Sequence, residues 1–128
     1  MSTLNYTQLC NLTTGLEQIH CTRPNADLKP GPWVIGMGTS KAFGTTVCYD
    51  HLPTITKTHA SRREYWVVKH GDFVSEAELL RCQGFELSDV IVPANVSHRK
   101  MLEMVGNAYT APVIHALFAD MLKALGRF

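Results

Sequence analysis

The sequence predicts an α+β fold, in which a small, mostly antiparallel sheet is followed by three helices. Residues 33–68 contain short runs of β-branched and aromatic residues between turn formers, a pattern typical of strands. Residues 75–128 carry helix-capping signals and apolar residues at spacings of three and four. With 128 residues, 45% of them hydrophobic, we expect one compact domain over 33–128, preceded by a poorly patterned segment, 1–32.

Each element rests on a local pattern. Apolar residues at helical spacing predict a short helix over 7–20, in which Gly15 is unfavourable. Strands are expected at 33–35, 45–49, 53–56 and 64–68, with a turn at 70–72. Gly36-Met37-Gly38 follows an apolar strand, as a cofactor-binding loop does, but no helical pattern comes after it. We therefore interpret it as a turn between strands.

The helical half has clear boundaries. Ser75 and Glu78 form a predicted capping box, and Gly84 is placed to end the helix that follows. A second helix is expected from near Ser97 to Gly106, and a third from Thr110 to about residue 125. The third carries a wide apolar stripe that requires a partner surface, formed by Val113, Ile114, Leu117, Phe118, Met121, Leu122 and Leu125.

Composition narrows the function classes. A net charge of +1 means that any contact with a polyanion has to come from a local patch. No apolar run approaches the ~20 residues that span a bilayer, and no secretory signal is visible, so an intracellular (cytoplasmic or nuclear) protein without a membrane partner is expected. The four cysteines form no CxxC pair and the histidines no ligand spacing, which predicts free thiols and no metal site.

Three segments occur in a recognisable order. Pro53-Thr54-Ile55-Thr56 comes first, then a block ending in Gln83-Gly84-Phe85, then Gly106-Asn107-Ala108 about twenty residues later. In this order and spacing, the chain resembles the C-terminal region of the C5-cytosine-specific DNA methyltransferases, over roughly residues 33–125. The matching positions of the middle block are Ser75, Glu78, Arg81, Gly84 and Phe85.

The resemblance implies roles for these residues. The middle block is structural, and Arg81 is expected in an ion pair. Gly106, Asn107 and Ala108 lie beside the methyl-donor pocket in such enzymes, where they help to hold S-adenosylmethionine. The fold would then correspond to the small lobe and terminal helix of an α/β methyltransferase, whose last helix returns to pack on the cofactor domain.

The chain also departs from the family. The family's leading Arg falls at Asp72, and two of its prolines fall at Glu76 and Glu86. No cysteine follows a proline, so the turn that carries the nucleophile is missing, as are the Glu-Asn-Val acid segment and the glycine-rich loop. We therefore assign no catalytic residue.

These observations predict the C-terminal portion of a DNA cytosine-5 methyltransferase, either a fragment or a small subunit. Because the chain begins at Met1 and is short, we expect a partner polypeptide to carry the catalytic half, and no methylation by this chain alone. The S-adenosylmethionine site would be shared with that partner chain or with a missing N-terminal region. Lys57, Arg62 and Arg63, with His59 nearby, are candidate DNA-binding residues, or else a solvated loop between strands. The alternatives are a non-catalytic DNA-binding or regulatory module derived from the family, and a degenerate remnant.

Overall fold

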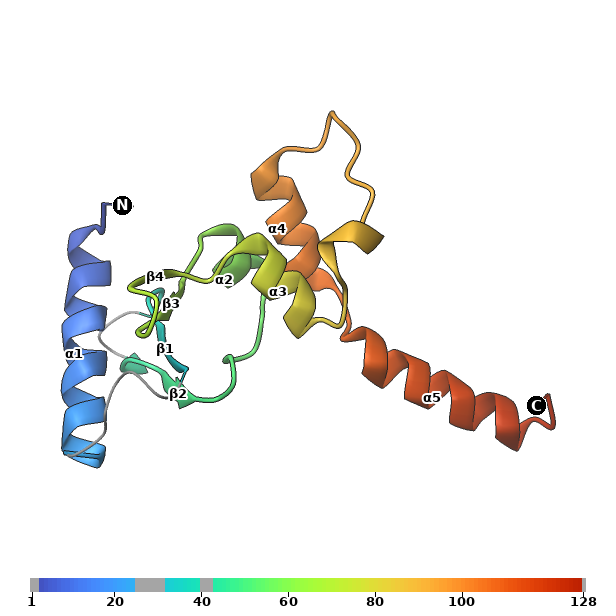
Figure 1. Cartoon of the computed structure of the whole chain (residues 1–128), viewed down its shortest axis with the longest axis horizontal. Coiled ribbons are helices and arrows are strands. Elements are labelled where there is room, and N and C mark those ends of the chain that lie inside the picture. Colours follow the sequence, from blue (N-terminus) through green and yellow to red (C-terminus); the bar gives the residue numbers. More distant parts are fainter. Residues whose placement is uncertain (1–2, 25–31, 40–42, 128) are drawn as a thin grey trace.

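The computed structural model describes residues 3–24, 32–39 and 43–127. Within these residues a four-stranded sheet lies between a long N-terminal helix and a group of shorter helices, and a last helix extends away from the rest (Figure 1). The helices are α1 (Tyr6–Thr22), α2 (Lys57–Ser61), α3 (Glu76–Cys82), α4 (His98–Asn107), α5 (Ala111–Ala124) and the 3-10 helix η2 (Leu87–Asp89). The strands are β1 (Trp33–Gly36), β2 (Val47–Tyr49), β3 (Tyr65–Val67) and β4 (Asp72–Phe73).

The sheet is antiparallel throughout and has the order β2-β1-β3-β4, which confirms the predicted α+β class. Its side chains alternate between two hydrophobic clusters, as the pleat requires. Val34 and Val67 pack with α2, α3 and α4, whereas Ile35 and Trp66 pack toward α1 on the opposite face. The sheet therefore separates two cores.

Two predictions about strands need correction. Residues 53–56 do not form a strand, because the Thr56 hydroxyl accepts a hydrogen bond from the His59 N–H and caps α2 instead. The predicted turn at 70–72 leads into β4, whose residue Phe73 pairs with Trp66 and was not anticipated as strand. In both cases the backbone finds its hydrogen-bond partners through tertiary neighbours that the local pattern does not reveal.

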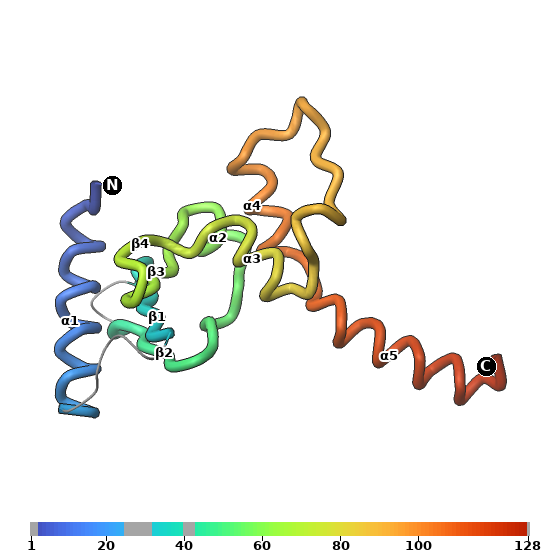
Figure 2. Tube along the Cα trace, viewed as in Figure 1, coloured from blue at the N-terminus to red at the C-terminus, as the bar shows by residue number. Residues whose placement is uncertain are grey.

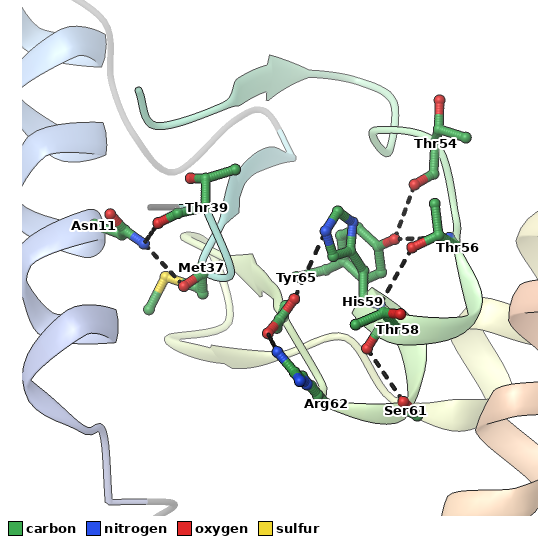
Figure 3. Close-up of polar contacts among 11 residues, drawn as sticks. Asn11, Met37, Thr39, Thr54, Thr56, Thr58, His59, Ser61, Arg62 and Tyr65 are labelled. Carbon is green, nitrogen blue, oxygen red and sulfur yellow. Dashed lines mark hydrogen bonds and ion pairs between the residues drawn. The ribbon is translucent and has the colours of Figure 1, made fainter. Parts of the chain in front are cut away.

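Helix α1 confirms the expected N-terminal helix and explains its glycine. A Cβ at Gly15 would lie 2.7 Å from the Cγ2 of Ile35, so only glycine lets the helix approach the sheet this closely. One turn earlier, the buried Asn11 side chain donates hydrogen bonds to the carbonyls of Met37 and Thr39, both at 2.9 Å (Figure 3). These contacts fix α1 on the sheet.

The predicted boundaries of the later helices agree with the structure. Ser75 and Glu78 form the capping box of α3, and Ser97 caps α4. Thr110 precedes α5, with Pro112 in its first turn. Among the described residues, no helix is long and apolar enough to cross a membrane.

Helix α5 leaves its apolar stripe in solvent. It projects from the end of α4 and has no buried residue (Figures 1 and 2). Five large side chains on it and at its C-cap are between 56% and 69% exposed: Val113, Leu117, Phe118, Met121 and Leu125. The partner surface that the sequence requires is thus not supplied by the described part of the chain.

Candidate cofactor rim and basic surface

The side chain of Gln83 joins the two helical segments that carry the resemblance. It is 5% exposed, and its Nε2 donates to the carbonyls of Val105 at 3.2 Å and Ala108 at 3.3 Å. Its Oε1 accepts from the Thr110 hydroxyl at 2.9 Å, and its own carbonyl accepts from the Ala111 N–H at 2.8 Å. A single buried amide therefore holds the end of α3 against the connection between α4 and α5.

Gly84 gives α3 the ending that the sequence predicts. It has a φ of +84°, and the N–H groups of Gly84 and Phe85 bond to the carbonyls of Arg81 and Leu80, the pattern of a Schellman motif. A Cβ at Gly84 would also overlap the ring of Pro112. The glycine is needed both for the turn and for the close approach of the first turn of α5.

Gly106 has a packing role rather than a turn role. It lies within α4, and a Cβ there would be 2.6 Å from the Lys57 backbone nitrogen and Cα, and 2.5 Å from the Thr56 carbonyl oxygen. Helix α4 can cross the start of α2 only because this side chain is missing. Asn107, the last residue of α4, and Ala108, its C-cap, are both exposed.

The three segments of the resemblance meet at one hollow of about 300 Å³. Its wall includes parts of the Pro53–Thr56 segment, of the α3 end and of the connection after α4: Thr54, Ile55, Cys82, Gln83, Ala108, Tyr109 and Thr110. Sequence spacing alone could not show that the first segment joins the other two. The structure thus places Ala108 on the wall of a pocket, with the exposed Asn107 next to it in the chain.

Tyr65 holds the first segment at this hollow. Its hydroxyl donates to the Thr54 carbonyl at 3.0 Å and accepts from the Thr56 N–H at 3.3 Å (Figure 3). Burial raises the pKa of Tyr65 despite the opposing hydrogen bond from the Thr56 N–H, so the phenol stays protonated and remains a donor. Sequence analysis missed this residue, because a tyrosine within a strand gives no signal of its partner.

The middle block supports α3 through its charges. Burial tends to raise the pKa of Glu78, but hydrogen bonds from the Ser75 side chain and backbone, with His70 and Arg81 nearby, lower it overall. The Nε of Arg81 lies 3.0 Å from a carboxylate oxygen of Glu86, and both side chains are exposed. Phe85 packs against the core formed by α3 and α4.

The candidate DNA-binding residues do not form one group. They belong to α2 and the residues after it, which corrects the loop expected there. Lys57 Nζ lies 3.7 Å from Glu103 of α4, whereas Arg62 lies 3.9 Å from Glu64. The guanidinium of Arg63, which has a φ of +52°, lies 5.7 Å from the centre of the Phe73 ring. The structure therefore directs Lys57 toward α4 and Arg63 toward the edge of the sheet.

Cysteines and possible metal ligands add no further site. Cys10, Cys21, Cys48 and Cys82 are all free, and burial raises the pKa of Cys48 and Cys82. A raised pKa favours the thiol over the nucleophilic thiolate. In the described ranges, no group of three or more His, Cys, Asp or Glu residues is arranged to hold a metal ion.

Comparisons with known proteins give no relative. No family model matches the sequence, no curated protein matches it, and no solved structure matches the fold.

Proposed function

We propose that this chain is the C-terminal portion, as a fragment or small subunit, of a DNA cytosine-5 methyltransferase. The observation that supports the proposal is the hollow at which three separate segments meet: Pro53–Thr56, the α3 end at Gln83, and Gly106-Asn107-Ala108. These are the segments that resemble the enzyme family in order and spacing. A cofactor site built from these segments requires them to lie together around one hollow, as they do here.

S-adenosylmethionine would supply the methyl group. The exposed Asn107 amide offers both a donor and an acceptor, and Ala108 contributes backbone groups on the wall of the hollow. The fit is partial, because about 300 Å³ is at the low end of the ~300–1,000 Å³ typical of ligand pockets. Asn107 and Ala108 would hold one side of the cofactor, and a partner polypeptide would hold the other.

The same partner would carry the nucleophile and the acid. Helix α5 supports this part of the proposal, since its stripe of five half-exposed apolar side chains has no covering surface in the described chain. Docking of α5 on the partner would bury this stripe and bring the hollow toward the rest of the cofactor site. Of the candidate DNA-binding residues, Lys57 would contact DNA phosphates, whereas Arg62 lies toward Glu64 and Arg63 toward Phe73.

Methyl transfer by a reconstituted enzyme tests the proposal. The chain would be mixed with the catalytic half of a C5-cytosine methyltransferase that ends before its own two terminal blocks, and transfer of labelled methyl groups to duplex DNA would be measured. Neither part should be active alone, and the assembled mixture should methylate cytosine. Activity of this chain alone, or an assembled but inactive mixture, contradicts the proposal.

A matched pair of variants locates the cofactor contact. Asn107→Ala should raise the KM for S-adenosylmethionine in the mixture, because it removes the exposed amide at the rim. Asn95→Ala removes another exposed amide, from the loop before α4, and should leave this KM unchanged. Equal effects of the two substitutions would argue against a cofactor role for Asn107.

A non-catalytic DNA-binding or regulatory module is the second candidate. Two positions at which the chain departs from the family carry polar contacts of its own, since Glu76 lies 2.8 Å from the His98 ring and Glu86 lies 3.0 Å from Arg81. These contacts lie wholly within this chain and favour a role that needs no catalytic partner. Duplex binding that is unaffected by any catalytic half would support this candidate.

A further inference from the structure

The Glu103 carboxylate lies within 4 Å of three cationic side chains from two helices. Glu103 of α4 lies 3.7 Å from Lys57 Nζ of α2, 3.6 Å from Arg99 Nε and 3.5 Å from Lys100 Nζ. The Glu103 side chain is only 18% exposed, whereas the three cationic side chains are between 54% and 76% exposed. The carboxylate is thus largely covered, and the cations around it face solvent.

The charge of this cluster is not balanced. One carboxylate cannot neutralise three cations, so the cluster keeps a charge of about two positive units, which exceeds the +1 of the whole chain. Helix α2 has no Asp or Glu, and Glu103 is the only acidic residue of α4. Of the other acidic side chains near the two helices, Glu64 lies 3.9 Å from Arg62, and Glu76 lies 2.8 Å from the His98 ring.

The positions of the three cations are fixed by rigid elements. Helix α2 packs closely on α4. Because Gly106 has no side chain, the backbone at Lys57 can lie against α4 at this point. Ser97 caps the start of α4 and accepts a hydrogen bond from the Lys100 N–H. The cations are therefore presented on a helix pair rather than on a loop.

We propose that Lys57, Arg99 and Lys100 form a phosphate-binding surface for the backbone of duplex DNA, with Glu103 as the carboxylate that neutralises part of their charge. This inference rests on the proposed function and changes its DNA contact, since Arg99 and Lys100 replace Arg62 and Arg63 as the neighbours of Lys57. About two unneutralised positive charges that face solvent suit contacts with DNA phosphates, which position the protein without reading sequence.

The surface and the cofactor rim share one helix. Arg99 and Asn107 are eight residues apart on α4, which corresponds to roughly 12 Å along its axis. A contact between DNA phosphates and the first turn of α4 would therefore set the distance from the DNA to the end of α4, where Asn107 and Ala108 lie. This gives α4 a positioning role for the nucleic acid as well as for the cofactor.

Binding of a short DNA duplex to the full chain tests the inference without a partner or cofactor. Fluorescence anisotropy would be measured over a range of salt concentrations for the wild type and for the triple variant Lys57→Ala, Arg99→Ala, Lys100→Ala. Each phosphate neutralised contributes about 0.9 to the slope of log K against log salt. The triple variant should therefore bind more weakly and lose about 2 to 3 from this slope.

A control variant separates the surface from overall charge. Lys69→Ala, Lys123→Ala, Arg127→Ala also removes three exposed cations, so both triple variants lower the net charge by three from +1 to −2. Only the first should lose most of the salt dependence. Equal losses in the two variants, or wild-type binding by the first, would overturn the inference, as would a wild-type chain that does not bind the duplex at low salt.

A reciprocal substitution tests the role of Glu103. Glu103→Gln raises the charge of the cluster by one and should tighten duplex binding severalfold with a steeper salt slope. Glu17→Gln makes the same change on the exposed face of α1 and should have no comparable effect. If the two substitutions act alike, the cluster is not the binding surface, while methyl transfer by the reconstituted enzyme would still report on the proposed function separately.

Discussion

Substitution of Gln83 perturbs the contact that joins the two helical segments. Gln83→Met keeps the length of the side chain but removes two donated hydrogen bonds and one accepted bond. A protein hydrogen bond contributes about 1 kcal/mol net, which gives a loss of ~3 kcal/mol for all three. Ala108 is exposed and Thr110 is only half-buried, so water can replace some of the lost hydrogen bonds. The expected loss of stability is therefore ~2 kcal/mol.

Urea unfolding measures this loss. With a denaturant slope of ~1–2 kcal/mol per M, a loss of ~2 kcal/mol lowers the unfolding midpoint by roughly 1 to 2 M. Gln83→Ala adds a cavity and should cost ~3 kcal/mol. The control, Gln18→Met on the exposed face of α1, should stay within ~0.5 kcal/mol of the wild type. If Gln83→Met costs no more than this control, the Gln83 hydrogen bonds do not hold the end of α3 against the connection between α4 and α5.

Three further perturbations test the packing and the charges. Gly106→Ala forces a Cβ against the backbone at Lys57 and should cost ~2–3 kcal/mol in urea unfolding, a result that an unchanged midpoint would contradict. Gly15→Ala meets side-chain atoms of Ile35 rather than backbone and should cost less, ~1–2 kcal/mol; a larger cost than that of Gly106→Ala would refute this ranking. The folded-state pKa of Glu78 is lowered, so its stabilising contribution is complete above the unfolded-state pKa and disappears as the pH falls through the folded-state value. Glu78→Gln should therefore be less stable than the wild type near pH 7, and this gap should close as the pH falls below the folded-state pKa; a gap that persists there would exclude this account.

Local signals predicted the helical half of the chain well. Ser75 and Glu78 specify the start of α3, and Gly84 specifies its end, because capping and left-handed backbone are satisfied within a few residues. Ser97 defines the start of α4 in the same way. Such interactions need no tertiary partner, so the sequence carries them directly.

Tertiary contacts account for what the sequence did not reveal. The Pro53–Thr56 segment has the composition of a strand, yet Tyr65 and the start of α2 take its hydrogen bonds. Gly15 is unfavourable for a helix, but the nearness of Ile35 makes it necessary. Sequence spacing likewise gave no reason to group Arg99 and Lys100 with Lys57, since the carboxylate that gathers them lies on another helix from Lys57.

Hydrogen exchange of the peptide spanning residues 104–110 tests the central claim most directly. The reconstituted complex would be compared with and without S-adenosylmethionine, after calorimetry has established that the cofactor is bound. If Asn107 and Ala108 form one wall of the methyl-donor site, exchange in this peptide should slow on binding, while exchange in α1 should not change. Cofactor binding that leaves residues 104–110 unprotected would contradict the assignment of this rim.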